Sequence, residues 1–206
     1  MYNTLGSAWL SACREIRNSG ERGRDGTDLL RERLHLCLKI RHPNPKDPIL
    51  LRHVRPEVLE WMRSNFRDQK LVPELGNSPS YAVRLRNHRG RDQIGWVVEK
   101  LKKKPESKSA TITTLLGDDE EYVPCVSLLD FKIRHRRLLL TVACRSIDAG
   151  VKLPANLIAL AELQAEVAER VGVPPGPMVL WIASAHIYER DLPAPARPRR
   201  ANALRG

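Results

Sequence analysis

The segment that decides the fold reads C-R-S-I-D-A-G-V-K-L-P-A-N-L, from Cys144 to Leu157. It joins two predicted elements, a strand over 138–144 and the longest helix of the chain over 154–171, which Gly172 ends. A last strand is predicted over 178–188. The polar residues of the segment therefore lie at the junction between a strand and a helix.

The rest of the chain mixes helices and strands in irregular order. Apolar residues at helical spacing predict further helices over 2–17, 56–66 and 92–103. Alternating apolar and polar residues predict strands over 34–40, 110–116 and 122–133, and the last of these has Cys125, Leu129 and Phe131 on one face. This pattern predicts an α+β domain with a mixed sheet.

Length and composition are those of one globular domain, which we predict to span residues 1–192 of the 206. Residues 193–206 alternate Pro and Ala with arginines, and we predict a disordered tail because this composition buries too little apolar surface. The chain shows no leader pattern and no apolar run of ~20 residues, so we expect a cytoplasmic protein without a membrane partner.

The net charge and the spacing of the cysteines limit the partners and sites that can be expected. The formal net charge of +11 indicates an anionic partner, which charge alone leaves open as nucleic acid, phosphorylated metabolite or membrane surface. The basic runs 14–28, 102–108 and 134–137 are interpreted as solvated surface, so nucleic acid is not expected. The four cysteines form no C-x-x-C pair, which indicates free thiols and no metal site.

Several short motifs follow one another in a fixed order. They are Y-x-x-R at 81–84, D-Q-I at 92–94, P-E-S at 105–107, P-C at 124–125, R-S-x-D at 145–148, L-P-x-N at 153–156 and A-H-I-Y at 185–188. In this order they resemble the motifs of thymidylate synthases, over roughly residues 80–192. The resemblance implies a thymidylate-synthase-like mixed sheet with packed helices, and an enzyme that adds a one-carbon unit to C5 of a pyrimidine nucleoside monophosphate.

The resemblance implies a nucleophile and a phosphate site. C5 of a pyrimidine is a poor nucleophile until a thiolate adds to C6, and this role falls to Cys125. Arg145 would lower the pKa of the thiol and bind the nucleotide phosphate together with Ser146. Asp148 would order the cofactor, 5,10-methylenetetrahydrofolate, or a water network.

The same resemblance implies contacts to the base and the sugar. Asn156 would read the pyrimidine edge through its amide donor and acceptor, and it favours uracil because cytosine-specific relatives carry aspartate there. His186 and Tyr188 would contact the sugar. The family forms homodimers, so Lys108, at the place of an arginine pair, would act in the phosphate site of the partner subunit.

Some functional residues of the family have more than one candidate in this chain. The glutamate that assists proton transfer is either Glu57 or Glu60, and the N-terminal phosphate-loop arginine is either Arg22 or Arg24. The family's closing C-terminal segment has no counterpart after Tyr188, which favours hydroxymethyl over methyl transfer because water would reach the reacting carbon. The alternatives are a cytidylate hydroxymethylase and a non-catalytic paralogue that binds nucleotides or nucleic acid.

The candidate residues also have structural explanations. A cysteine in an apolar strand is usually packing, and the other three cysteines are interpreted that way. Arg145 and Asp148 would form a surface ion pair, and Asn156 would cap the long helix. His186 would be a hydrogen-bonded histidine of the core, and Tyr188 an aromatic residue of a strand.

Overall fold

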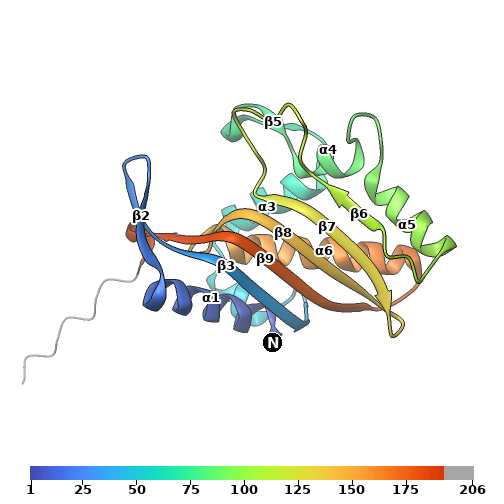
Figure 1. The fold of residues 1–206 in the computed structure, drawn as a ribbon, viewed down its shortest axis with the longest axis horizontal. Helices are drawn as coiled ribbons and strands as arrows, with labels where there is room; N and C mark the ends of the chain where they lie inside the picture. The colour runs from blue at the N-terminus through green and yellow to red at the C-terminus, as the bar shows by residue number, and fades with distance from the viewer. Residues whose placement is uncertain (193–206) are drawn as a thin grey trace, which may run out of the picture.

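One seven-stranded mixed sheet carries the fold (Figure 1). The computed structural model describes residues 1–192, so the predicted tail over 193–206 lies outside the described residues. The strand order is β1-β3-β9-β8-β7-β6, and β2 pairs with β3. The strands are β1 (Tyr2–Thr4), β2 (Glu21–Asp25), β3 (Asp28–His42), β6 (Ala110–Thr113), β7 (Val126–Arg134), β8 (Arg137–Asp148) and β9 (Pro175–Tyr188).

The helices connect these strands and pack on the sheet. They are α1 (Leu5–Ser19), α2 (Pro48–His53), α3 (Pro56–Arg67), α4 (Tyr81–Arg86), α5 (Gln93–Lys103) and α6 (Lys152–Val171). The parallel strands β8 and β9 require a crossover connection, and α6 provides it. Short strands β4 (Leu71–Val72) and β5 (Ser78–Pro79) form a separate pair. The predicted α+β class with a mixed sheet is confirmed.

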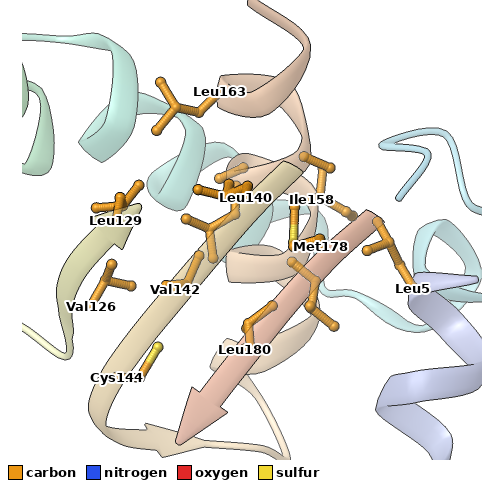
Figure 2. Packing of buried hydrophobic residues seen from close by; sticks show 14 of the residues in the cluster. Leu5, Val126, Leu129, Leu140, Val142, Cys144, Ile158, Leu163, Met178 and Leu180 are labelled. Atoms are coloured by element: carbon orange, nitrogen blue, oxygen red, sulfur yellow. The ribbon is translucent and has the colours of Figure 1, made fainter. Parts of the chain in front are cut away.

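The core lies between the helices and one face of the sheet. Figure 2 shows Leu140, Val142, Met178 and Leu180 of the sheet packed beside Ile158 of α6, and all are fully buried or nearly so. On the same face, α1 packs on β3 and β9, and α5 packs on β6 and β7. The opposite face keeps large apolar side chains exposed, namely Leu34, Leu128 and Trp181. Within the described residues this face is uncovered.

The position of Cys125 corrects the sequence-based strand. β7 begins at Val126, so Cys125 lies in the preceding loop and not inside the strand. A bulge follows at once, because Val126 pairs with Cys144 whereas Leu128 pairs with Ala143. The extra residue reverses the alternation of side chains, so Cys125 does not share a strand face with Leu129.

The position of Asn156 corrects a second expectation. The long helix starts at Lys152, two residues before Pro154, because a proline in the first turn needs no backbone N–H partner. Asn156 therefore lies in the second turn, where its Nδ2 donates to the Lys152 carbonyl at 3.0 Å. The prediction that Asn156 caps the helix was wrong.

The run 14–28 was interpreted as solvated surface, but part of it forms the β2–β3 hairpin. Gly26 adopts a φ of +59° in the two-residue turn between Asp25 and Asp28, a conformation that favours glycine. Most side chains of β2 are exposed, so no apolar alternation revealed the strand. Among residues 1–192, no helix is long and apolar enough to cross a membrane.

Candidate active site

A pocket of about 500 Å³ lies where the parallel strands β8 and β9 end, beside the β2–β3 hairpin and the loop before β7. Six of the eight predicted site residues line it: Cys125, Arg145, Ser146, Asp148, His186 and Tyr188. They come from three separate stretches of the chain. Sheet pairing places Asp148 directly beside His186. The fold thus brings the distant motifs into one cavity.

The loop that carries Cys125 is anchored on both sides. The Cys125 carbonyl accepts a hydrogen bond from the Arg145 N–H at 2.9 Å, and the Val126 N–H donates to the Tyr81 Oη at 3.0 Å. Cys125 itself is partly exposed and lines the pocket. The thiol therefore has a fixed backbone on a wall that a substrate can reach.

The other cysteines lie outside this pocket. Cys144 is buried in the core and Cys37 is exposed on β3. Burial, together with the nearby charge of Asp148, raises the pKa of the Cys13 thiol to about 12. A thiol with such a pKa stays protonated at neutral pH, and Cys125 is the one cysteine of residues 1–192 that lines this pocket.

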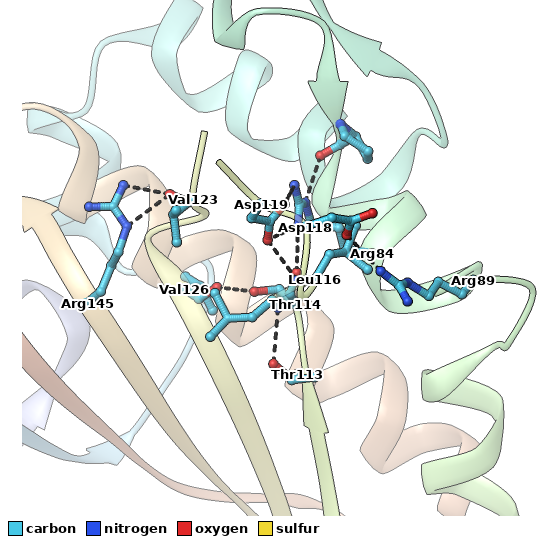
Figure 3. Close-up of polar contacts among 12 residues, drawn as sticks. Arg84, Arg89, Thr113, Thr114, Leu116, Asp118, Asp119, Val123, Val126 and Arg145 are labelled. Atoms are coloured by element: carbon cyan, nitrogen blue, oxygen red, sulfur yellow. Dashed lines mark hydrogen bonds and ion pairs between the residues drawn. The ribbon is translucent and has the colours of Figure 1, made fainter. Parts of the chain in front are cut away.

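Arg145 crosses from β8 to the loop before Cys125. Figure 3 shows its guanidinium next to the Val123 carbonyl, to which Nε and Nη2 donate at 2.9 and 2.6 Å. Its Nη1 has no partner in the described part of the chain. The predicted ion pair with Asp148 does not form, because that carboxylate accepts from the N–H groups of Gly150 and Val151 instead. Arg145 can thus offer Nη1 to an anion.

Asp148 is buried and the neighbouring His186 is half-buried, and both side chains are titratable. Burial raises the pKa of Asp148, although the amides of Val151 and Gly150 and the charge of His186 oppose the shift. Burial lowers the pKa of His186 against the opposing charges of Asp148 and other carboxylates. The Ser146 Oγ lies 3.4 Å from the His186 Nδ1. Burial therefore favours the neutral imidazole, and it favours the protonated carboxyl more than in an exposed aspartate.

Tyr188 links the pocket to the hairpin, because its Oη donates to the Asp25 carboxylate at 2.7 Å. This bond, with burial and the charge of Asp25, raises the pKa of Tyr188 to about 12. The ring meets His186 edge-on at 5.2 Å. Tyr188 and His186 thus line a cavity and are only half-buried.

Several lining residues were missed by the sequence analysis. They are Asp25, Arg55, Tyr122, Val151, Lys152, Arg190 and Asp191. Asp25 and Arg55 lie in polar surroundings, with no motif and no apolar pattern to mark them. Only the pairing of β2 with β3 and the start of α3 bring them to the pocket.

The open alternatives for the glutamate and the N-terminal arginine stay open. Neither Glu57 nor Glu60 lines the pocket, and Glu60 instead lies 3.4 Å from Arg67 on the outer side of α3. Arg22 and Arg24 lie on the hairpin beside Asp25, but neither lines the pocket.

Two predicted residues are not brought to the pocket wall. Asn156 is buried one helical turn behind Lys152, and its Oδ1 has no hydrogen-bond partner among the described residues. Lys108 lies in the loop between α5 and β6, where it lines a different cavity with Arg134 and Arg136. Within one chain, Lys108 is therefore not part of this pocket.

Tyr81 supports the Cys125 loop from the core, and its replacement by phenylalanine tests this. The change leaves the buried Val126 N–H without an acceptor, so we expect the free energy of unfolding to fall by about 1–3 kcal/mol in urea denaturation. The control is Tyr2→Phe, which removes a partly exposed hydrogen bond from Ser11 and should cost less than about 0.5 kcal/mol. Equal losses in the two variants would contradict the role given to Tyr81.

Comparison with known proteins places the chain in a family. The family model described as "Thymidylate synthase" matches residues 54–197. Proteins named "Putative thymidylate synthase" are similar to it: one from Methanosarcina barkeri is 35% identical over 91% of this chain and 88% of the relative, and one from Methanosarcina mazei is 46% identical over 54% of each. A thymidylate synthase from Mycoplasma genitalium is 27% identical over 71% of this chain and 52% of the relative. With its ordered motifs gathered in one pocket, the chain belongs to the thymidylate synthase family.

Proposed function

We propose that this protein transfers a one-carbon unit from 5,10-methylenetetrahydrofolate to C5 of a pyrimidine nucleoside monophosphate, with uridylate as the favoured substrate. The observation that carries the proposal is the single pocket that holds Cys125, Arg145, Ser146, Asp148, His186 and Tyr188. Its volume of about 500 Å³ is in the range of small-molecule sites.

Cys125 is proposed as the nucleophile. Its Sγ forms a bond to C6 of the ring, and the electron pair of the C5–C6 double bond moves toward C5 and the O4 carbonyl. C5 would then form a bond to the one-carbon unit and lose its proton, and the bond from that unit to the folate nitrogen would break. Addition of a hydride, which the folate would supply, or of water to the transferred carbon would complete a methyl or a hydroxymethyl group, and the Sγ–C6 bond would break and release the Cys125 thiolate. Asp148 and His186 lie beside each other in the same pocket and are proposed to move the protons of these steps.

The nucleotide phosphate is proposed to bind Arg145 and Ser146. Two nitrogens of the Arg145 guanidinium are held by the Val123 carbonyl, which fixes the orientation of the remaining Nη1. Of the other lining cations, Arg55 and Arg190 already lie beside Asp191, and only Lys152 forms no ion pair among the described residues. The pocket therefore has few free cations for a dianion, which supports the expected contribution of Lys108 from a second copy.

The uncovered face of the sheet supports a homodimer. It exposes Leu34, Leu128 and Trp181 at 53%, 36% and 43%, although large apolar side chains are stabilised by burial. A second copy on this face would bury them.

The base preference is proposed to depend on Asn156. Its Nδ2 is held by the Lys152 carbonyl, and its Oδ1 is a buried acceptor without a partner in the described residues. Uracil presents a donor at N3, whereas cytosine presents an acceptor there, so this acceptor would fit uracil if nucleotide binding exposes Asn156, which lies behind the pocket wall in the free chain. His186 and Tyr188 are left to contact the sugar.

The pocket residues also fit the folate. The Oδ2 of Asp148 accepts no hydrogen bond from the described chain and can accept one from a pterin N–H, while Lys152 and Arg55 can bind the glutamate carboxylates. When bound, methylenetetrahydrofolate supplies the one-carbon unit.

Release of tritium from 5-tritiated nucleotides tests the proposal. The protein is incubated with methylenetetrahydrofolate and labelled uridylate or cytidylate, in ribo and deoxy forms. Release from uridylate is expected, release from cytidylate alone would indicate a cytidylate hydroxymethylase, and no release from any of the four would favour the non-catalytic alternative. The mass of the product then distinguishes methyl from hydroxymethyl transfer.

Asp148→Asn tests how much the ionised, buried carboxyl of Asp148 destabilises the fold. Because the folded-state pKa of Asp148 is above its ordinary value of 3.8, folding is favoured most below pH 3.8, and this contribution is lost as pH rises through the folded pKa. Asn keeps the acceptor for Gly150 and Val151 without the charge. We expect the variant to lose turnover but to gain roughly 2–4 °C in Tm at pH 7.5.

The matched control is Asp118→Asn, which should bring no gain, because a hydrogen bond from Arg89 lowers the pKa of this exposed carboxyl. Calorimetry at pH 7.5 and 4.5 measures both variants. The gain from Asp148→Asn should narrow at the lower pH, and a constant gain would contradict the explanation.

A further inference from the structure

One carboxylate of the pocket has no part in the proposed phosphate site or in the proposed proton transfers. Asp25, the last residue of β2, lines the cavity together with Tyr188 and His186. Its negative charge repels the dianion of a nucleoside monophosphate, and Asp28 lies directly opposite in the hairpin, so that two like charges face each other. A carboxylate at this position therefore opposes both the hairpin and the phosphate, unless a ligand donates hydrogen bonds to it.

The neighbours of Asp25 fix its position. The Tyr188 Oη donates to the Asp25 Oδ2 at 2.7 Å. Arg190 lies over the Tyr188 ring at 4.3 Å and forms an ion pair with Asp28 at 2.7 Å, which ties the ring to the other strand of the hairpin. Sheet pairing of Leu30 with Tyr188 adds a further connection. The carboxylate is thus held at the pocket wall before any ligand binds.

The hydrogen bond between Tyr188 and Asp25 determines what the two side chains can offer a ligand. Tyr188 gives its only hydroxyl hydrogen to Asp25, so its Oη can only accept a hydrogen bond from a ligand. The Asp25 Oδ1 has no hydrogen-bond or ion-pair partner among residues 1–192, and a carboxylate offers acceptors only. The pocket wall therefore presents two adjacent acceptors, and they require two donors that lie close together on the ligand.

These two acceptors lie next to the proposed phosphate site. The Ser146 Oγ lies 3.4 Å from the His186 Nδ1, and the His186 ring meets the Tyr188 ring edge-on at 5.2 Å. The side chains therefore form a row that leads from Ser146 through the two rings to Asp25. A nucleotide whose phosphate binds at Ser146 would lay its sugar along the later members of this row.

We propose that Asp25 selects a ribonucleotide over a deoxyribonucleotide, an inference that rests on the proposed binding of a pyrimidine nucleoside monophosphate in this pocket. The 3′-hydroxyl donates to the Tyr188 Oη, and the 2′-hydroxyl donates to the Asp25 Oδ1. A ribose supplies both donors, whereas a 2′-deoxyribose leaves the carboxylate oxygen without one. Carboxylates bind the ribose 2′-hydroxyl in this way in dinucleotide-binding folds. A site that hydrogen-bonds a hydroxyl discriminates against the analogue that lacks it, so Asp25 is a specificity-determining residue.

The affinities of three nucleotides for the full-length protein test this inference. They are uridylate, deoxyuridylate and 2′-fluoro-2′-deoxyuridylate, in which fluorine replaces the 2′-hydroxyl but donates no hydrogen bond. Titration calorimetry without folate measures the three dissociation constants. The unchanged protein should bind uridylate at least about tenfold more tightly than either analogue, because the hydrogen bond from the 2′-hydroxyl is made to a charged group.

Asp25→Asn separates sugar selection from a purely structural role of this residue. The amide oxygen can still accept from Tyr188, but an amide donor replaces the free acceptor, so the three nucleotides should bind within about threefold of one another. The matched control is Glu21→Gln, which removes one charge from the exposed start of the same hairpin, outside the pocket. It should keep the preference for uridylate. The readout is the ratio of affinities, because loss of a negative charge strengthens the binding of all three dianions.

Other results would overturn the inference. Equal affinities in the unchanged protein, or a preference for uridylate that survives in Asp25→Asn, would show that Asp25 does not bind the sugar. If the 2′-fluoro nucleotide binds like uridylate, the preference depends on the size of the substituent and not on a donor. If Glu21→Gln removes the preference as completely as Asp25→Asn, overall charge is its cause.

Tritium release distinguishes a failure of this inference from a failure of the proposed reaction. A preference for uridylate that depends on Asp25, without release from any nucleotide, would refute the one-carbon transfer and support the sugar contact. Release from deoxyuridylate as fast as from uridylate, with equal affinities, would overturn the role of Asp25 and support the transfer. Absence of binding by all three nucleotides would overturn both.

Discussion

Cys125→Ser is expected to reduce turnover by roughly 10⁴-fold or more, because a serine hydroxyl at neutral pH cannot replace a thiolate that adds to C6. The backbone of residue 125 is held by the Arg145 N–H, and Val126 is held by Tyr81, so neither contact involves the thiol. The variant should therefore fold normally and bind uridylate with unchanged affinity. Tritium release measures turnover, and equilibrium binding measures the affinity.

The matched control for this prediction is Cys37→Ser. Cys37 is exposed on β3 in the single chain and pairs with Trp181 on the sheet face proposed to bind a second copy, and serine has nearly the same size as cysteine there. Turnover of this variant should stay close to that of the unchanged protein. A Cys125→Ser protein with more than about one hundredth of the original turnover would refute the nucleophile assignment, whereas loss of binding as well would point to a folding defect.

Much of the fold was predictable because periodic apolar patterns report burial directly. The helices over 56–66 and 92–103 and the end of α6 at Gly172 match the structure within about two residues. The errors arise where the pattern is interrupted. The bulge at Val126 moved Cys125 out of its strand, and the exposed β2 hairpin carries no apolar alternation.

The candidate site was predictable where its residues belong to short sequence motifs. Arg145, Ser146 and Asp148 are close in sequence, and the parallel pairing of β8 with β9 adds His186 and Tyr188. Contacts between polar residues that are distant in the chain leave no motif in the sequence.

Glu60 is a residue that the sequence marked as a candidate but that does not line the pocket. It follows Leu59, which faces the core, so the glutamate faces outward. A motif fixes residue types, whereas the direction of a side chain depends on how the helix is rotated against its neighbours.

The second large effect is expected from Arg84→Ala, which should lower the free energy of unfolding by about 3–5 kcal/mol. Arg84 is 1% exposed, and it forms a two-pronged ion pair with Asp119 at 2.7 and 2.8 Å (Figure 3). Its Nη1 also donates to the Thr114 carbonyl, and its Nε donates to the Pro79 carbonyl. Removal of the guanidinium leaves a nearly buried carboxylate and two carbonyls without these donors.

The neighbouring pair provides a matched control. Arg89 and Asp118 approach to 2.7 Å, the same separation, but their side chains are 63% and 74% exposed. Arg89→Ala should therefore change stability very little, because exposed ion pairs are weak. Urea denaturation at 25 °C compares the two variants. If Arg84→Ala does not fold, Asp119→Asn, which keeps an acceptor for Leu116, should show a smaller loss in the same direction.

The acid dependence of unfolding should identify the cause of the loss. Burial alone would raise the pKa of Asp119, but the bonds from Arg84 and the Leu116 N–H, with the charge of Arg84, outweigh it and lower this pKa below 3.8. The pair therefore stabilises the fold fully above pH 3.8, and the contribution is lost as pH falls through the folded pKa. Without Arg84, burial dominates, and the carboxyl should destabilise the fold as it ionises. The difference in stability between the unchanged protein and Arg84→Ala should thus shrink on acidification, whereas a difference that is independent of pH would indicate impaired packing and not the removal of a charge partner.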